Sequence, residues 1–555
     1  MSPSDAPVRD RAGGASRFRR FLAPAVLLAL AAAGLDIAQW LRATPLWVDE
    51  QMIALNVRDR PFVDLAGPLW LGQSAPLGWL VIQRVIVRAA GTSELVVRFV
   101  PLLFGILTLA AAAWIGHRWL HRWSAALLVA LVAVGQWMSH YRFELKHYSA
   151  DAFWALLLPA MAAWAAEEAD PARARRRWTR WWAVAALGQW VANGAVFVIP
   201  SCTMILALVL FRRHGLRAAT TFALTGSLWL ASFAAHYALS LQYTHHSRYL
   251  RNYWASYVAP PGGIAGTLEW IGGRFESLAA HPGGTEYVAV FWAAVAAGFV
   301  LSRRRLVPVM FASVPVMAVA LGVAGLVPLH DRVAFWIAPA LYVGIVLLAD
   351  AGIDHLSTPR QDHRRRALAP GAFALGLALI VSADILATGW RHLDIGLPLN
   401  RNRALDDRGA VQWLMERRQR GDALITSRLG WPAIWWYGGI GLRHKAPGGR
   451  LLDGTVMYVV SHERPAAGCT ALLQETLSRH PRVLLYVGFP DMQTDFFDVA
   501  IADLSRMGPV VETAAFGDIG RAAVIDLRGL AQAAVPDDLS TPGRDCLRLV
   551  PARRW

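Results

Sequence analysis

Long apolar runs alternate with short Arg-rich stretches through the first 390 residues of this chain. Several runs reach the roughly 20 residues that an α-helix needs to cross a bilayer. Placing one helix between successive basic stretches predicts about eleven membrane spans. The predicted spans lie near residues 21–41, 98–116, 124–139, 149–166, 181–192, 194–211, 218–240, 286–302, 306–327, 333–350 and 368–388.

The two spans on either side of Asn193 are the shortest part of this pattern. One long tilted helix would also fit the region, but every later loop would then change side. The basic stretches at 303–305 and 354–366 would face outward, against the positive-inside rule. Two spans are therefore favoured, which places the N-terminal tail, residues 1–20, in the cytoplasm and the C-terminus outside.

Composition agrees with this pattern, since 55% of the residues are hydrophobic and only 17% are charged, against roughly a quarter in soluble domains. The net charge of +16 is concentrated in the cytoplasmic basic stretches. It is therefore a topology signal and does not indicate nucleic-acid binding. We predict a multi-pass protein of the bacterial inner membrane, with a transmembrane domain over residues 21–390.

The outward segment 42–97 is too polar to span the membrane. It contains two amphipathic stretches, near residues 50–65 and 75–89, punctuated by prolines. Such stretches are typical of helices that lie in the membrane interface. We therefore predict a periplasmic loop with two interfacial helices.

The C-terminal region, residues 391–555, differs in kind because its charges are dense and its apolar runs shorten to strand length. Strand-like runs alternate there with helical patterns, which predicts a small periplasmic α/β domain with a partly parallel sheet. The strand-like runs are 423–426, 483–487 and 523–526, and the helical patterns are 410–420 and 471–480.

Two of the three cysteines, Cys469 and Cys546, fall in this outer domain. An even pair in an oxidising compartment predicts a disulfide. Two free, buried thiols are the alternative, and the spacing fits neither a zinc site nor a thioredoxin motif.

An adjacent acidic pair, Asp49-Glu50, follows the first span. Carboxylates beside hydrocarbon are costly to keep, so such groups are candidates for function. The alternative is a helix N-terminus, where acidic side chains interact favourably with the helix dipole.

A second charged segment, residues 141–151, fills the short outer turn between the third and fourth spans. It brings together Glu144, Lys146, Tyr148 and Asp151, which is dense for the tip of a hairpin. The alternative is a belt of aromatic and basic residues at the membrane interface.

A third segment, His330-Asp331-Arg332, comes just before the tenth span. The planar guanidinium group of an Arg suits a phosphate because it binds oxyanions through two parallel hydrogen bonds. The alternative is an Arg that extends along the helix to reach the aqueous interface.

The long outer segment 241–285 carries a mixture of His, Arg and aromatic residues around His245, His246 and Arg248. Paired His could bind a metal, but adjacent His side chains rarely share one ion on a helix. Basic and aromatic residues more readily meet lipid phosphate or sugar rings.

These segments, taken in order and with their common outward side, resemble the GT-C glycosyltransferases. The nearest families in this respect are the protein O-mannosyltransferases and the bacterial aminoarabinose transferases, and the resemblance covers residues 20–390. It implies a GT-C-like fold and a polyprenyl-phosphate-linked sugar as donor. The acceptor would be an envelope lipid, polysaccharide or protein at the outer face of the membrane.

The resemblance also implies roles for residues: Asp49 as catalytic base, Glu144 or Asp151 as a second acidic site, and Arg332 at the donor phosphate. A divalent metal stays open, because some relatives hold one between the acids and others need none. The expected catalytic residues are Asp49, Glu50 and Glu144, and the expected substrate-binding residues are Arg332, Lys146, Tyr148, Asp151, His330 and Arg248.

A transporter or flippase that performs no glycosyl transfer is the main alternative. It would place ionisable groups near the bilayer midplane and would show repeat symmetry and broken helices. Here the acidic residues cluster at the outer ends of the spans and a soluble domain follows them. We therefore expect an enzyme, a glycosyltransferase that inverts the configuration at the sugar carbon.

Overall fold

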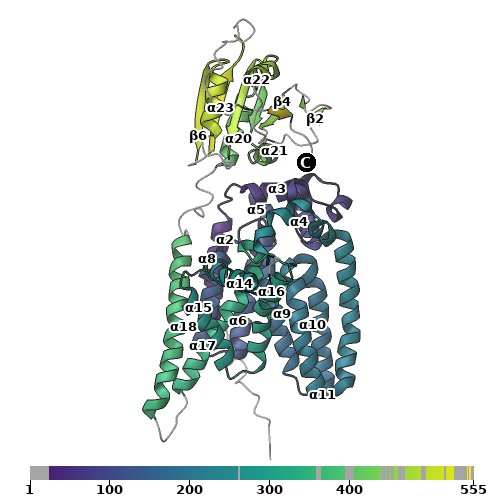
Figure 1. The fold of residues 1–555 in the computed structure, drawn as a ribbon, viewed down its shortest axis with the longest axis vertical. Helices are drawn as coiled ribbons and strands as arrows, with labels where there is room; N and C mark the ends of the chain where they lie inside the picture. Colours follow the sequence, from purple (N-terminus) through teal and green to yellow (C-terminus); the bar gives the residue numbers. More distant parts are fainter. Residues whose placement is uncertain are drawn as a thin grey trace, which may run out of the picture. The chain divides into compact units, whose positions relative to one another are not determined.

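The computed structural model describes residues 24–260, 263–357, 364–393, 406–438, 445–446, 450–451, 455–460, 469–488, 496–517, 520–529, 547 and 549–551. They divide into two compact units (Figure 1). The helical unit contains the described residues of Met1–Leu41, Ala75–Ile82 and Arg98–Ile395. The α/β unit contains those of Arg42–Ser74, Gln83–Val97 and Gly396–Trp555.

The helical unit consists of long apolar helices joined by short turns (Figure 1). Among the described residues, six helical segments are long and apolar enough to cross a membrane, and α2, α7 and α15 are shorter apolar helices. The helices are α2 (Pro24–Trp40), α6 (Phe99–Trp119), α7 (Arg122–Val134), α8 (Gln136–His140), α9 (Tyr148–Ala166), α10 (Pro171–Val191), α11 (Asn193–His236), α12 (Gln242–His245), α13 (Arg248–Tyr253), α14 (Gly263–Ala280), α15 (Val288–Leu301), α16 (Leu306–Val323), α17 (Ala338–Ser357) and α18 (Arg364–His392), with the short turns η3 (Tyr237–Leu241), η4 (Ala255–Tyr257) and η5 (Asp331–Ile337).

The hairpin around Asn193 forms as two separate helices. The extended backbone of Ala192 separates α10 from α11, and α11 itself breaks at Gly215, whose φ of 80° suits a residue without Cβ. The indole of Trp182 donates to the Phe222 carbonyl at 3.2 Å, so α10 packs beside the second arm of α11. Three helical arms thus cover the region for which three spans are predicted.

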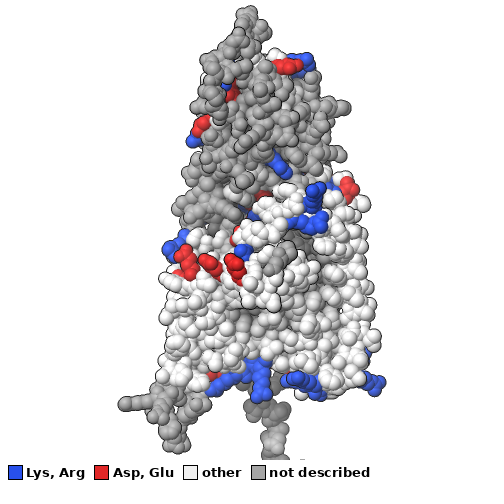
Figure 2. All heavy atoms as spheres, in the orientation of Figure 1, with Lys and Arg blue, Asp and Glu red and all other residues white. Residues whose placement is uncertain are grey.

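Basic residues from three described Arg-containing stretches meet at one end of the helical unit. Arg118 pairs with Glu167 at 3.0 Å, Arg213 donates to the Ala166 carbonyl at 2.6 Å, and Arg304 pairs with Asp350 at 3.7 Å. Figure 2 shows Lys and Arg gathered at that end, next to a broad band with almost no charge. This distribution is the one that the positive-inside rule predicts.

The outer segment 241–285 is more helical than the sequence indicates. It contains α12, α13 and η4, followed by the 18-residue helix α14. Several glycines in α14 disfavour helix in isolation, which is why the pattern reads as a loop. The indole of Trp292 on α15 donates to the Phe275 carbonyl of α14 at 2.9 Å, so packing on the bundle stabilises this helix.

The α/β unit is built around a mixed sheet in the order β2-β3-β4-β1-β5-β7-β6, with β8 paired to β4. β1 lies between β4 and β5 and is parallel to both, whereas β7 and β6 are antiparallel. The predicted strands at 423–426, 483–487 and 523–526 are all present. The strands are β1 (Ala423–Thr426), β2 (Lys445–Ala446), β3 (Arg450–Leu451), β4 (Val456–Val460), β5 (Arg482–Val487), β6 (Val510–Phe516), β7 (Gly520–Asp526) and β8 (Leu549–Pro551).

Alternate residues of the strands face opposite sides of this sheet. Ile425 and Leu485 face a core that α22 (Cys469–Leu477) and α23 (Phe496–Ser505) complete with Leu473 and Leu504. On the other face, α20 (Asp407–Arg417) packs on β5 and β7 and also contacts α21 (Trp431–Tyr437). The predicted fold class, a polytopic helical protein with a C-terminal α/β domain, is confirmed.

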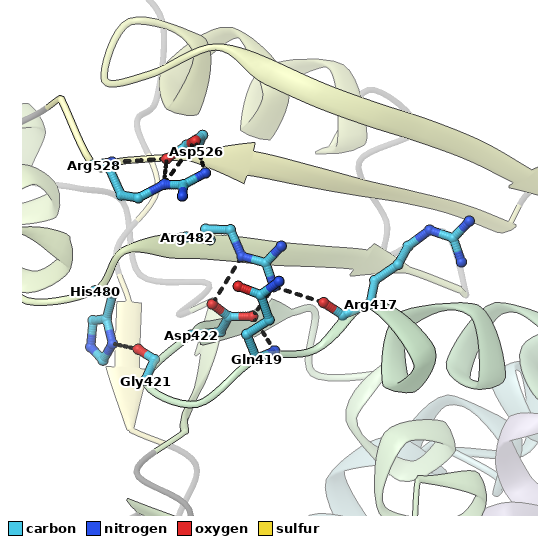
Figure 3. A network of polar contacts seen from close by, with 8 residues as sticks. All are labelled: Arg417, Gln419, Gly421, Asp422, His480, Arg482, Asp526 and Arg528. Atoms are coloured by element: carbon cyan, nitrogen blue, oxygen red, sulfur yellow. Dashed lines mark hydrogen bonds and ion pairs between the residues drawn. The ribbon is translucent and has the colours of Figure 1, made fainter.

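A polar network lies at one end of the central strands β1 and β5 (Figure 3). Arg482 at the start of β5 donates to both oxygens of the fully buried Asp422, and its Nη2 donates to the Arg417 carbonyl at 2.7 Å. The backbone N–H of Gln419 donates to the same carboxylate at 2.7 Å. A buried charge is tolerated when all its partners are supplied in this way, so the network fixes where β1 and β5 begin.

The loop between the first two spans contributes to both units. The predicted interfacial helices appear as α3 (Val48–Asp59) and α4 (Leu77–Ala90), and the first part of α4 belongs to the helical unit. α3, η1 (Val63–Ala66), η2 (Trp70–Gly72) and α5 (Glu94–Val97) belong to the α/β unit, where α3 packs against α21. The predicted disulfide between Cys469 and Cys546 lies outside the described residues, because Cys546 is not among them.

A buried ion pair joins the turn between α8 and α9 to the helix bundle. Arg142 Nη1 donates to both carboxylate oxygens of Asp36 on α2, at 2.7 and 2.8 Å, and Nη2 donates to the Val132 carbonyl of α7 at 2.7 Å. A Cβ on Gly105 of α6 would lie 2.1 Å from Arg142 Cγ, so only glycine leaves room for this side chain.

We expect Arg142→Met to destabilise the protein by about 3–5 kcal/mol, because it leaves the Asp36 carboxylate buried without its cation. Thermal unfolding of the purified protein measures the loss. The double variant Arg142→Met with Asp36→Asn removes both charges and should recover much of the stability. A double variant as unstable as the single one would show that the ion pair does not explain the effect.

The charge distribution predicts that the C-terminus lies outside the cytoplasm. A reporter that is active only in the periplasm, fused after Trp555, should therefore be active in cells. The matched control is a reporter active only in the cytoplasm, fused at the same position, which should be silent. The reverse result would overturn the predicted orientation.

Candidate functional site

The predicted acidic pair lies in the first turn of α3, where its two members differ in surroundings. Glu50 is 2% exposed, and its Oε2 accepts a hydrogen bond from the Trp47 backbone N–H at 2.8 Å. It therefore caps the helix N-terminus, a role that suits a carboxylate at this end of the dipole. Asp49 is only half-buried, so its carboxylate is the more accessible of the two.

The residue after the pair ties α3 to the rest of the α/β unit. Gln51 is fully buried, and its Nε2 donates to Asp407 Oδ2 at 2.6 Å and to the Leu46 carbonyl at 2.7 Å. Tyr486 on β5 donates its hydroxyl to the other oxygen of Asp407. Asp407 is the first residue of α20 and is itself buried.

In the helical unit, the predicted charged segment is almost entirely buried. Glu144, Lys146 and Tyr148 are each at most 8% exposed. Glu144 Oε2 lies 3.7 Å from Nε2 of His140, the last residue of α8, and the Lys146 N–H donates to the Glu144 carbonyl at 2.6 Å. Burial favours a functional role for this segment over the alternative of an exposed interfacial belt.

His147 and Asp151 meet the start of α11. His147 Nε2 lies 3.0 Å from Asn193 Nδ2 and 3.5 Å from Asp151 Oδ2, while Asp151 Oδ1 accepts from the Gly194 N–H at 2.8 Å. Burial lowers the pKa of His147 to about 3, and the charge of Lys146 adds to the effect. His147 is therefore a neutral imidazole at physiological pH.

The short turn η5 carries the third predicted segment against the second. Phe335 of η5 packs edge-on against Tyr141, with ring centroids 4.8 Å apart, and a Cβ on Gly194 would lie 2.4 Å from Trp336 Cβ. Arg332 is three residues before Phe335, which corresponds to about 6 Å along a 3₁₀ turn. The 3₁₀ turn that contains Arg332 therefore packs on the start of the charged turn.

Arg332 lies in a cationic cluster with His330 and Arg274 of α14. Burial lowers the pKa of His330, and the charges of Arg274 and Arg332 lower it further, although Asp331, 3.0 Å away, opposes them. The His330 ring stacks on Tyr257, with centroids 3.8 Å apart and planes 7° apart. The backbone of Asp331 is left-handed, with φ 40°, a conformation that Asp tolerates better than most residues.

Arg248 lies apart from this buried region, exposed at the start of α13. Aromatic rings lead from α13 toward the cationic cluster: Tyr253 contacts Trp254 at 4.8 Å, Trp254 contacts Tyr257 at 5.7 Å, and Tyr257 stacks on His330. An exposed Arg beside aromatic rings suits a headgroup or a sugar better than a metal.

The predicted residues therefore fall into two groups. Glu144, Lys146, Tyr148, Asp151, His330, Arg332 and Arg248 belong to the helical unit, and Asp49 and Glu50 belong to the α/β unit. The convergence of Asp49 with Glu144 and Arg332 on one site stays a prediction. Of the residues that the structure describes, no three His, Cys, Asp or Glu gather closely enough to hold a metal ion.

Three polar residues of this region escaped the sequence reasoning. His281 Nε2 lies 2.8 Å from the Tyr141 hydroxyl, Asn193 contacts His147, and Arg274 lies in the cationic cluster. Arg274 and His281 belong to no recognisable motif, and Asn193 stands only as the boundary between two predicted spans. No local pattern marks them, because their partners are distant in the sequence.

Comparison with solved structures shows what the fold is similar to. ArnT from Cupriavidus metallidurans in the apo state matches with a TM-score of 0.51 at 12% identity, over 94% of this chain and 100% of that chain. The same protein bound to undecaprenyl phosphate matches with a TM-score of 0.52 at 13% identity, over 90% of this chain and 97% of that chain.

The Archaeoglobus fulgidus oligosaccharyltransferase, in complex with Zn and sulfate, matches with a TM-score of 0.47 at 13% identity, over 86% of this chain and 69% of that chain. Neither a family model nor a curated protein sequence matches the chain. The likeness to ArnT confirms the predicted GT-C-like fold.

The buried carboxyl of Asp407 predicts a pH dependence of stability. Burial raises its pKa to about 7, the charge of Asp406 adds to the rise, and the hydrogen bond from Gln51 opposes it. The ordinary value, about 3.9, applies in the unfolded chain. Between about pH 4 and 7 the folded state therefore holds a proton that the unfolded state has lost, so stability falls as the pH rises through this window.

We expect the thermal midpoint of the wild type to fall between about pH 5 and 8 by more than that of Asp407→Asn, which cannot ionise. Thermal unfolding of both purified proteins over this range measures the difference. Parallel curves for the two proteins would show that Asp407 is not the group responsible.

Proposed function

We propose that this chain is a GT-C-type glycosyltransferase. It transfers a sugar from a polyprenyl-phosphate-linked donor to a hydroxyl acceptor at the outer face of the bacterial inner membrane. ArnT, whose fold this chain shares, has been solved with undecaprenyl phosphate bound. The observation that carries the proposal is the buried charged turn, residues 141–151. The 3₁₀ turn η5 packs on this turn through Phe335 and also contains Arg332 of the cationic cluster.

The proposed reaction is a direct displacement. The oxygen of the acceptor hydroxyl forms a bond to the anomeric carbon while the bond from that carbon to the phosphate oxygen breaks. The acceptor proton passes to Asp49, and polyprenyl phosphate leaves with the electron pair. A carboxylate base suffices because phosphate is a good leaving group, and a single displacement inverts the configuration.

Asp49 is the better candidate for the base because it is the more accessible carboxylate of the pair. Glu50 already accepts the Trp47 N–H, so we assign it to hold the first turn of α3. Glu144 is the second acidic group of the proposed site. Asp151 holds the N-terminus of α11 through the Gly194 N–H, which suits a residue that shapes the site.

The cationic cluster is the proposed binding site of the donor phosphate. Arg332 and Arg274 flank a His330 whose pKa is lowered, so the two guanidinium groups carry the positive charge at neutral pH. Guanidinium groups bind phosphate oxygens in a fixed geometry and stabilise the charge that develops on the leaving group. Lys146 and Tyr148 would contact the sugar, and exposed Arg248 would contact the acceptor or a lipid headgroup.

We expect Asp49→Asn to reduce turnover by about 10²–10⁴-fold, because the amide keeps the size of the side chain but cannot take the proton. Donor binding should change little. Arg332→Ala should do the reverse and weaken donor binding first. The measurement is transfer from a synthetic polyprenyl-phosphate sugar by the purified protein, with donor binding assayed separately.

The matched control is Asp64→Asn, which neutralises an exposed carboxylate in the same loop and should leave turnover unchanged. Equal turnover by wild type and Asp49→Asn would remove Asp49 from the mechanism. A wild-type protein that moves the lipid across the membrane but transfers no sugar would support the transporter instead.

A further inference from the structure

One face of α3 is bonded to residues of the C-terminal domain. Successive helix residues are rotated by about 100°, so Gln51 and Arg58, seven residues apart, lie on the same side. Gln51 donates to Asp407, and Arg58 donates to the Trp436 and Trp435 carbonyls of α21 at 2.9 and 3.0 Å. Both ends of this face are therefore bonded to residues of the C-terminal domain.

Asp49 is on the other side of the same helix. It precedes Gln51 by two residues, which corresponds to a rotation of about 200°. The face that carries Asp49 is thus roughly opposite to the face that is bonded to α20 and α21. Any tilt or rotation of α3 against the C-terminal domain would move the Asp49 carboxylate.

Strand β5 supplies a second hydrogen bond to Asp407, the residue that Gln51 contacts. Tyr486 faces away from the core that contains its neighbour Leu485, and its hydroxyl donates to Asp407 Oδ1 while Gln51 donates to Oδ2. A Cβ on Gly488 would lie 2.1 Å from the Tyr486 hydroxyl and 2.5 Å from Asp407 Oδ1. The backbone at Gly488 therefore leaves room for this contact only when no side chain is present.

A second bond holds the residues just before the helix. The Leu46 N–H donates to the Tyr437 hydroxyl of α21 at 2.7 Å, and the Leu46 carbonyl accepts from Gln51. The chain that enters α3 is thus bound on both its N–H and its C=O.

We propose that Gln51, Asp407 and Tyr486 form a positioning clamp through which the C-terminal domain fixes α3 and sets the place of the Asp49 carboxylate. The clamp residues do not touch the reacting atoms and act through α3 alone. The inference rests on the proposed role of Asp49 as the base. It gives the C-terminal domain a part in the reaction, because a displacement of about 1 Å in a reacting group can reduce the rate about 10²-fold.

The test uses two variants of the full-length protein that disturb the clamp in different ways. Tyr486→Phe removes the hydroxyl, and Gly488→Ala inserts a Cβ between Tyr486 and Asp407. The matched control is Tyr458→Phe, which removes a hydroxyl that lies 3.2 Å from His480 on the opposite face of the sheet. Hydrogen exchange of the amides of residues 47–59 measures how firmly α3 is held, and kcat and donor KM are measured on the same preparations.

Both clamp variants should raise amide exchange in α3 by about tenfold or more and lower kcat by roughly 10–100-fold, with donor KM unchanged. Tyr458→Phe should change neither quantity. A merely structural role would instead lower the fraction of active protein and leave exchange in α3 at the level of the control.

Unchanged exchange in α3 would overturn the clamp whatever happens to activity. Faster exchange with an unaltered kcat would overturn its role in positioning Asp49. If the wild type transfers no sugar, the proposed function fails and the catalytic part of this inference fails with it, whereas the exchange data still decide whether the clamp holds α3.

Discussion

The buried ion pair between Arg142 and Asp36 is the interaction on which the arrangement of the α8–α9 turn depends. A guanidinium in a helix bundle is stable only when its charge and its N–H groups are satisfied inside the protein. Asp36 supplies the charge and the Val132 carbonyl completes the bonding, so the turn is tied to α2 and α7 at once. Gly105 makes the approach of Arg142 possible, and the neighbouring Glu144 is then buried in a defined place.

A different constraint governs the acidic pair. α3 lies in a loop that comes early in the chain, yet its side chains are bonded to α20, α21 and, through Asp407, to β5. Glu50, within α3 itself, caps the start of the helix. Hydrogen bonds from Gln51 and Arg58 then attach α3 to the C-terminal domain. A functional carboxylate in a loop gains a defined position by being attached to a sheet with a well-packed core, because that core lacks the mobility of the loop itself.

Much of the architecture could be predicted because it rests on local patterns. The alternation of apolar and basic stretches gave the helices of the bundle, and strand β1 begins and ends at the predicted residues, 423 and 426. α14 was missed because its glycines weaken the helical signal, and packing on α15 compensates for them. The contact of Gln51 with Asp407 spans 356 residues of sequence. Neither residue belongs to a motif, so no pattern in the sequence could reveal it.

The state of His330 bears on how the proposed phosphate site would work. A protonated imidazole beside two guanidinium groups would add a third cation to a crowded cluster, and burial and the two Arg side chains disfavour that form by lowering the pKa. A neutral ring can instead stack face to face on Tyr257, which holds it in place without charge. Arg274 and Arg332 are then left as the cations of the cluster. Two guanidinium groups can stabilise the charge of a leaving phosphate at any pH in the physiological range, because both stay protonated there. In the proposed donor site the imidazole would thus act as an uncharged spacer, and its neutrality would keep donor binding from depending on pH near 7.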